Sequence, residues 1–148
     1  MLIRELTTEE CRDVLARTHL GRLGCARLDQ PYIVPIHFSF DDAARCVYAF
    51  STIGQKVYWM RDNPKVCLEV EEIVDGHQWT TVVATGLYQE IQNDPGEADA
   101  RTRAAELFEQ RAEWWLPAAA NVPWRGRSDI VIYRIQIERL TGRRTTAS

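Results

Sequence analysis

The sequence predicts a mainly β (α+β) protein: a six-stranded antiparallel Greek-key split barrel with peripheral helices. Strand patterns come in runs joined by short turns instead of alternating with helices, which excludes a doubly wound parallel sheet. Tyr32 to Phe40 alternates strongly apolar positions with less apolar ones, as a strand with one buried face does. Antiparallel strands of this length tend to close or nearly close into a barrel, because closure removes exposed edges.

Length and composition indicate a single domain over residues 1–148. The 45% hydrophobic and 26% charged content is ordinary for a globular protein. The net charge of -3 argues against a nucleic-acid binder and against a polybasic membrane anchor. No apolar run approaches the ~20 residues of a membrane helix, and the first residues lack the pattern of a secretory signal. We therefore expect a cytoplasmic protein that contacts neither nucleic acid nor membrane.

The spacing of the four cysteines and three histidines predicts no metal site. Cys11, Cys25, Cys46 and Cys67 are spread evenly along the chain, with no Cys-x-x-Cys pair. The histidines add no zinc-ligand spacing. Reduced thiols and no bound metal are the expectation.

The first half of the chain predicts one helix followed by three strands. A capping box, with Thr7 as N-cap and Glu10 three residues later, begins the helix, and Gly21 is its expected stop. Pro35 cannot donate a ladder hydrogen bond, so we expect it at an edge, a bulge or a barrel opening. The expected strands are Arg22–Leu28, Tyr32–Phe40 and Cys46–Ser51.

The second half predicts two helices and three more strands. Gly86, in the middle of a long strand, indicates a bend or a close backbone approach. A helix that ends at Asp62 fits the sequence Asn63-Pro64, because a residue before proline avoids the α region. The expected elements are helix Gly54–Asp62, strand Lys65–Glu71, strand Trp79–Ile91, helix Gly96–Trp115, an irregular Pro117–Ser128, strand Ile130–Leu140 and a frayed tail Thr141–Ser148.

The segment Ser51-Thr52-Ile53-Gly54-Gln55-Lys56 carries the strongest chemical signal. It lies where a strand ends and a helix begins, so free backbone N–H groups and the helix dipole favour an anion there. The hydroxyls of Ser51 and Thr52 and the ammonium of Lys56 suit phosphate oxygens. The alternative is an ordinary helix cap, in which Ser51 or Thr52 satisfies the first turn and Lys56 is merely solvated.

Four segments of the chain resemble one family in order and spacing. They are Gly21–Gly24, Pro31–Phe38, Tyr48–Lys56 and Asn63–Cys67. Together they resemble the split-barrel flavin-binding group related to pyridoxamine 5'-phosphate oxidase, and within it the nitroimidazole-resistance (Nim-like) flavoproteins. The resemblance runs from about Gly21 to Ile91 and implies a homodimer that binds two FMN molecules at the subunit interface.

The resemblance also implies roles for particular residues. His37 would line the active site as a catalytic group, although a lone histidine beside a strand core is more often hydrogen-bonded packing. Thr81 would reach the phosphate or the ring from across the barrel or the dimer, although strand propensity explains it equally. The FMN-binding residues implied are Val34, Pro35 and Ile36 around the isoalloxazine, Ser51, Thr52, Gln55 and Lys56 at the phosphate, and Thr81.

Two functions therefore stay open at this point. The first is an FMN-dependent oxidoreductase that reduces a small nitroaromatic or quinone-like acceptor with NADH or NADPH. The second is a flavin or haem carrier without turnover, favoured by the shortage of catalytic residues besides His37. Trp114, Trp115 and Trp124 are open between core packing, an interface and a lid over a partner's flavin.

Overall fold

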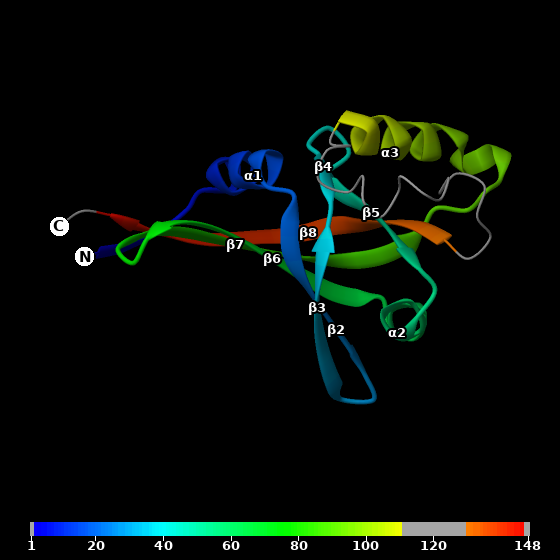
Figure 1. The fold of residues 1–148 in the computed structure, drawn as a ribbon, viewed down its shortest axis with the longest axis horizontal. Helices are drawn as coiled ribbons and strands as arrows, with labels where there is room; N and C mark the ends of the chain where they lie inside the picture. Colours follow the sequence, from blue (N-terminus) through cyan, green and yellow to red (C-terminus); the bar gives the residue numbers. More distant parts are fainter. Residues whose placement is uncertain (1, 111–129, 147–148) are drawn as a thin grey trace.

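The computed structural model describes residues 2–110 and 130–146 (Figure 1). It contains one antiparallel sheet and three α-helices. The strands are β1 (Leu2–Glu5), β2 (Leu20–Arg27), β3 (Gln30–His37), β4 (Ser39–Asp41), β5 (Cys46–Thr52), β6 (Lys65–Asp75), β7 (Gln78–Glu90) and β8 (Ile130–Thr146). The helices are α1 (Thr8–Arg17), α2 (Gln55–Asp62) and α3 (Ala98–Gln110), with a 3-10 turn at Pro95–Glu97 before α3.

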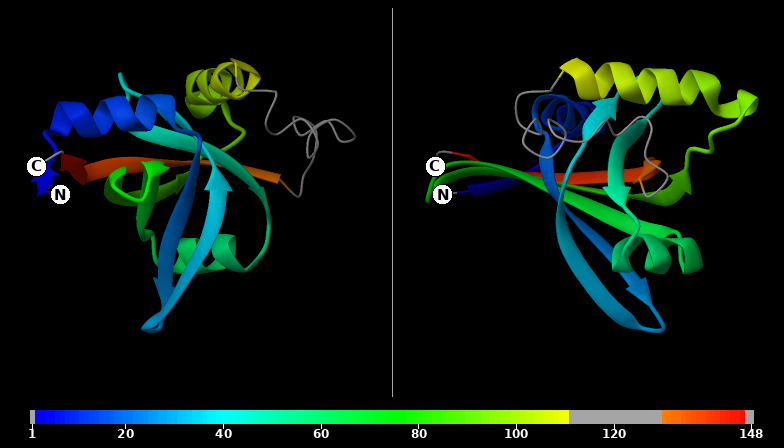
Figure 2. Two further views of the ribbon diagram at one scale, coloured as in Figure 1. Left: turned by 60° about the vertical axis from the view of Figure 1, so that its left-hand side comes forward. Right: turned by 45° about the vertical axis from the view of Figure 1, so that its right-hand side comes forward.

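The sheet curls back on itself and so forms a split barrel. Its strand order is β3-β2-β6-β7-β8-β5-β4, and β1 pairs with the end of β8 outside this path. The two strands at the ends of the order, β3 and β4, are separated in the chain by Phe38 alone, so the ends of the sheet must meet (Figure 2). No ladder joins β3 to β4 in the described ranges, and the sheet is therefore not closed. The predicted mainly β, antiparallel split-barrel class is confirmed.

The described residues form eight strands where the sequence predicted six. The predicted strand Tyr32–Phe40 is divided at Phe38, whose backbone N–H donates to the carbonyl of His19 at 2.9 Å. The last strand continues to Thr146 because β1 pairs with it from Leu2↔Thr146 to Glu5↔Arg143. The sequence predicted a frayed tail from Thr141, and this is wrong for residues 141–146, which belong to β8.

The helices follow their predicted signals closely. The capping box is present: the Glu10 N–H donates to Thr7 Oγ1 at 3.1 Å, and the Thr7 N–H donates to Glu10 Oε1 at 3.0 Å. Helix α1 ends at Arg17, before the expected stop at Gly21, because Leu20 already pairs with β3. Helix α2 agrees with its prediction to within one residue. The predicted continuation of α3 to Trp115, the irregular segment 117–128 and Trp124 lie outside the described residues.

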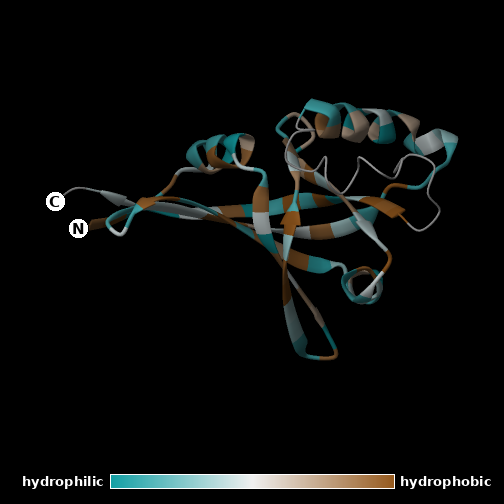
Figure 3. Ribbon diagram, viewed as in Figure 1, coloured by the Kyte–Doolittle hydropathy of each residue, from teal (hydrophilic) through white to brown (hydrophobic). Residues whose placement is uncertain are grey.

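The core has two parts. The main cluster fills the barrel beneath α1, with Tyr133, Phe38, Leu15 and Leu23 among its fully buried side chains. The second lies between α3 and strand β5, where the Phe50 and Phe108 rings meet edge to face at 5.2 Å. Figure 3 shows the alternation of hydrophobic and hydrophilic positions along the strands that produces these two faces.

Gly86 lies at the predicted close approach. The register between β7 and β8 passes from Thr85↔Arg139 to Gly86↔Ile137, so Glu138 is the extra residue of a β-bulge. A Cβ added at Gly86 would lie 2.1 Å from the Gln136 carbonyl oxygen. Only a glycine fits where these two backbones cross. The predicted close backbone approach at Gly86 is therefore confirmed.

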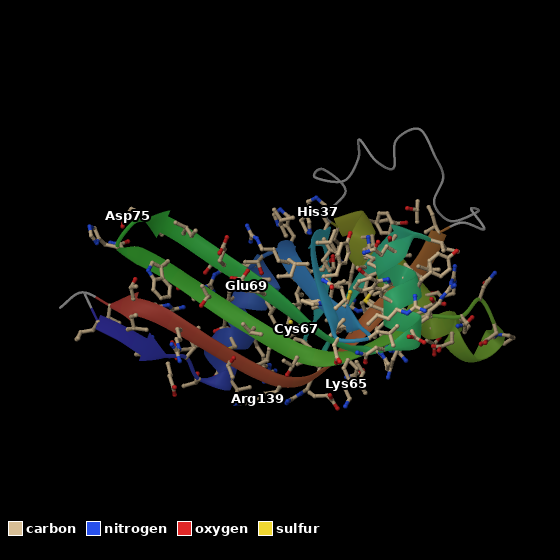
Figure 4. All side chains as sticks on the ribbon, turned by 90° about the horizontal axis from the view of Figure 1, so that it is seen from below. His37, Lys65, Cys67, Glu69, Asp75 and Arg139 are labelled. Atoms are coloured by element: carbon tan, nitrogen blue, oxygen red, sulfur yellow. The ribbon has the colours of Figure 1, made fainter. Side chains whose placement is uncertain are left out.

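The outer face of the sheet points away from the main core cluster. In Figure 4 no helix lies over the outer face of β6, β7 and the second half of β8. The register places cross-strand neighbours on it, such as the row Pro35, Arg22, Glu69, Val83 and Thr141. This outer face and the start of α2 contain all the residues discussed below.

Within residues 2–110 and 130–146, no helix is long and apolar enough to cross a membrane. All four cysteines are free, three of them buried and Cys67 half-buried. The same residues contain no cluster of three or more His, Cys, Asp or Glu side chains arranged to hold a metal ion.

Candidate functional site

The start of α2 has no side-chain cap. Its N-cap residue is Gly54, and among the described residues no side chain accepts a hydrogen bond from the first turn. The first turn also contains no acidic residue. The Ser51 hydroxyl donates instead to the carbonyl of Thr52 at 2.7 Å. The helix-cap interpretation of Ser51 and Thr52 is therefore wrong, and within residues 2–110 and 130–146 the first N–H groups of α2 have no side-chain partner.

Lys56 lies in the first turn of α2 and is half-buried. Burial lowers the pKa of its ammonium, and the nearby Cys25 thiol acts in the opposite direction. No described carboxylate lies within ion-pair distance of Lys56. A partly desolvated cation beside an uncapped helix start favours a bound anion, because both the charge and the helix dipole would gain a partner.

Gln55 and Thr52 flank this site on the surface. Both are exposed, whereas Ser51 is 8% exposed. The side chains of Thr52 and Gln55 are therefore accessible to a ligand at the α2 start, and the Ser51 hydroxyl is committed to the Thr52 carbonyl in this conformation.

Helix α2 lies against β2, and one aromatic contact joins it to the adjacent strand β3. The Trp59 ring of α2 packs against the Tyr32 ring of β3 at 5.6 Å between centroids. Pro35 is exposed at the terminal strand of the sheet order, as its missing N–H predicted. Val34 is half-buried, while the Ile36 side chain is buried in the core and offers a ligand only its backbone.

His37 ends β3 on the outer face beside His19, a neighbour that the sequence analysis did not identify. The two imidazoles are stacked with centroids 6.4 Å apart and 14° between their planes. Burial lowers the pKa of His37, and a hydrogen bond to the backbone of His19 opposes that shift. A lowered pKa favours the neutral imidazole, which can both donate and accept a proton near neutral pH.

Thr81 lies at the opposite end of the sheet from α2. It is close to the β6–β7 hairpin, opposite Glu71 of β6 and Arg143 of β8. Glu71 is six residues along β6 from Lys65, which corresponds to about 20 Å of strand. Figure 1 shows this hairpin and α2 at opposite ends of the molecule. One chain therefore does not bring Thr81 to the residues at the α2 start.

Charged side chains on β2 and β6 form a group on the outer face of the sheet. Arg22 pairs with Glu71 at 3.0 Å and lies 3.6 Å from Glu69. The Glu69 Oε1 atom is buried without a hydrogen-bond partner among the described residues. Burial raises the pKa of Glu69, and the neighbouring Glu71 adds to the increase. Because β6 lies between β2 and β7 in the sheet, these carboxylates are not at a sheet edge.

Comparison with known proteins identifies the family. The sequence matches the family described as pyridoxamine 5'-phosphate oxidase over residues 7–144. This chain belongs to the pyridoxamine 5'-phosphate oxidase family. The resemblance inferred from the four motif segments is thereby confirmed.

Individual relatives agree with this membership in the pyridoxamine 5'-phosphate oxidase family. An uncharacterized protein from Rhizobium meliloti (strain 1021) is 40% identical over 150 residues, which cover 99% of this chain and 98% of the relative. The crystal structure of a FAD-binding protein from Mesorhizobium loti is 38% identical, with a TM-score of 0.81 over 99% of this chain and 100% of its own. A candidate 5-nitroimidazole antibiotic resistance protein from Bacteroides thetaiotaomicron shares the fold at 12% identity, with a TM-score of 0.66 over 97% of this chain and 89% of its own.

Proposed function

We propose that this member of the pyridoxamine 5'-phosphate oxidase family binds a flavin nucleotide, with FMN as the expected cofactor. The observation that carries the proposal is the uncapped start of α2 with its half-buried Lys56. FMN and FAD both have a phosphate next to the ribityl chain, and this phosphate suits the α2 start. The 38% identical FAD-binding protein from Mesorhizobium loti supports a flavin.

The residues of β3 suit the remainder of the same ligand. Pro35 presents an exposed apolar surface, and the adjacent Val34 and Ile36 can contribute backbone groups and apolar contact. Burial of a ring against this strand would exclude water from one of its faces. The Tyr32–Trp59 contact fixes β3 relative to α2, so the phosphate and ring positions are held together by packing.

The proposed activity is reduction of a small nitroaromatic or quinone-like acceptor with NADH or NADPH. A bound flavin supplies the electron and hydride transfer that no side chain can provide. The contribution of His37 is to hold a proton at one imidazole nitrogen and to donate it to the acceptor, or to accept one. Its lowered pKa keeps the neutral form available, and His19 restricts the orientation of the ring.

The absorbance spectrum tests this function directly. We expect the purified protein, alone or after addition of FMN or FAD, to show flavin bands in the visible region. Heat release followed by chromatography then distinguishes FMN from FAD. Anaerobic addition of NADH or NADPH should bleach the bands, and His37→Gln should keep the flavin but slow the transfer to an acceptor.

The same spectra distinguish the proposed enzyme from a protein that binds no flavin, a haem carrier and a flavin carrier. A colourless protein that binds neither flavin would contradict the proposal. A Soret band would indicate a haem carrier, and a flavin that neither NADH nor NADPH bleaches would indicate a flavin carrier without turnover. Equal rates for wild type and His37→Gln would remove His37 from the reaction.

We further propose that two copies of the chain form a homodimer through the outer face. The distance between Thr81 and α2 supports a dimer, since a second chain is needed if both contact one flavin. Hydrophobic side chains at the hairpin end of the molecule add support, because strand alternation places Ile3 and Ile73 on the outer face, where they are exposed by 54% and 67% in a single chain.

Light scattering at micromolar concentration should therefore give a mass of twice 17.1 kDa. Ile73→Asp introduces a charge on the outer face of β6, the side that Glu69 and Glu71 share, and should shift the mass toward one chain. Ile73 is 67% exposed and is not among the core residues, so the fold should be preserved and circular dichroism should not change. A wild-type mass of 17.1 kDa would contradict the homodimer.

A further inference from the structure

A polar cavity lies at the second half of β8, away from α2. Its volume is about 500 Å³, within the range of small-molecule sites. The lining residues are Glu5, Leu6, Thr81, Val83, Arg139, Leu140, Thr141, Gly142 and Arg143. On one edge β8 pairs with β5 up to Gln136 and with β1 from Arg143 onward. The cavity lies along β8 between the segment paired with β5 and the segment paired with β1.

Two arginines face this cavity with no ion-pair partner among the described residues. They are Arg139 and Arg143, both exposed, and Figure 4 shows Arg139 at the free edge of β8. Neighbouring arginines do form ion pairs: Arg144 lies 3.3 Å from Glu10, and Arg22 lies 3.0 Å from Glu71. Strong cations that have no carboxylate of their own are suited to an external anion.

The remaining polar groups of the cavity agree with an anionic ligand. Thr81 and Thr141 provide hydroxyls that can donate to oxygen atoms. Glu5 is the one carboxylate among the lining residues, so two guanidinium charges and one carboxylate leave a net charge of +1. Glu71, opposite Thr81 on β6, is already neutralised by Arg22.

We propose that Arg139, Arg143, Thr81 and Thr141 form a second anion site that binds a phosphate group of a small molecule. A guanidinium presents paired N–H donors that match two oxygens of one phosphate. The cavity is too large for a lone phosphate, and a nucleotide-sized ligand fits its volume. The site lies apart from the α2 start of the same chain and requires no flavin, although it shares Thr81 with the flavin contact proposed across the dimer.

Two kinds of ligand carry a phosphate group that suits this site. One is the second phosphate of a dinucleotide flavin, which would reach the cavity of one chain from a flavin held by another. The other is a separate phosphorylated substrate or electron donor. The site requires only the phosphate, so its existence and its source are tested by different titrations.

Calorimetric titration with inorganic pyrophosphate tests the site itself. We expect Arg139→Gln and Arg143→Gln each to weaken pyrophosphate about tenfold, because each removes a charge-assisted contact. Arg27→Gln is the matched control, since Arg27 is also an exposed strand arginine but pairs with Asp62 at 3.2 Å. Because the α2 start is itself proposed as an anion site, the arginine variants are compared in the Lys56→Ala background, in which binding at the second site should be retained.

Two results would refute the second anion site. If pyrophosphate affinity is insensitive to both arginines, or if the arginine variants only shift the oligomeric mass, the phosphate site is refuted. If the site is supported, FMN and FAD titrations of Arg143→Gln identify the source. A loss confined to FAD indicates a dinucleotide, and unchanged affinity for both indicates a separate phosphorylated ligand.

Discussion

Lys56→Ala is expected to weaken FMN binding by about ten- to a hundredfold while leaving the fold intact. A charge-assisted hydrogen bond contributes roughly 1.5–3 kcal/mol, which corresponds to this range in affinity. Partial burial makes the contact stronger than at an exposed lysine, because water screens it less. The ammonium makes no ion pair in the described chain, so its removal breaks no structural contact of that kind.

The experiment is a fluorescence-quenching titration of FMN and riboflavin on wild type and Lys56→Ala. Riboflavin lacks the phosphate, so its affinity should hardly change. Lys65→Ala is the matched control, because Lys65 is an exposed lysine at the start of the neighbouring strand β6. Equal FMN affinity in wild type and Lys56→Ala would mean that the α2 start does not hold the phosphate. Circular dichroism excludes unfolding as the reason for any loss.

Elements with local signals were predicted well from the sequence. The capping box at Thr7 and the proline after Asn63 act on residues within one turn, and both helix boundaries appear in the structure. The motif from Ser51 to Lys56 is contiguous, so its position between a strand and a helix was also predictable. Local chemistry of this kind is readable because no distant partner is needed to define it.

Elements that depend on distant partners were missed. Strand β1 has four residues and no clear alternation, and it is a strand because it pairs with the last residues of β8. The break at Phe38 likewise depends on distant partners, because residues up to His37 pair with β2 whereas Ser39–Asp41 pair with β5. The same limit applies to the sites. His19 is beside His37, and Arg143 is beside Thr81, only through the sheet register.

Gly86→Ala is expected to lower the free energy of unfolding by about 3 kcal/mol, the upper part of the range for overpacking. The new Cβ would lie 2.1 Å from the Gln136 carbonyl oxygen and 2.9 Å from its carbonyl carbon, and neither backbone atom can move aside as a side chain can. Urea denaturation followed by circular dichroism measures the loss. Gly76→Ala is the matched control, because a Cβ there meets nothing within 4 Å, and its effect should be within about 0.5 kcal/mol.

The same substitution tests how the fold presents the second anion site. Before the bulge, the odd-numbered Tyr133 and Ile135 point into the main core; after it, the even-numbered Leu140 does so. Because Glu138 is the extra residue, Arg139 and Arg143 point outward instead of following Ile135 inward. If Gly86→Ala relieved its clash by removing the bulge, both arginines would turn toward the core, and pyrophosphate binding would be lost along with stability. A variant as stable as wild type, with unchanged pyrophosphate affinity, would show that the close crossing at Gly86 neither constrains the sheet nor directs these arginines outward.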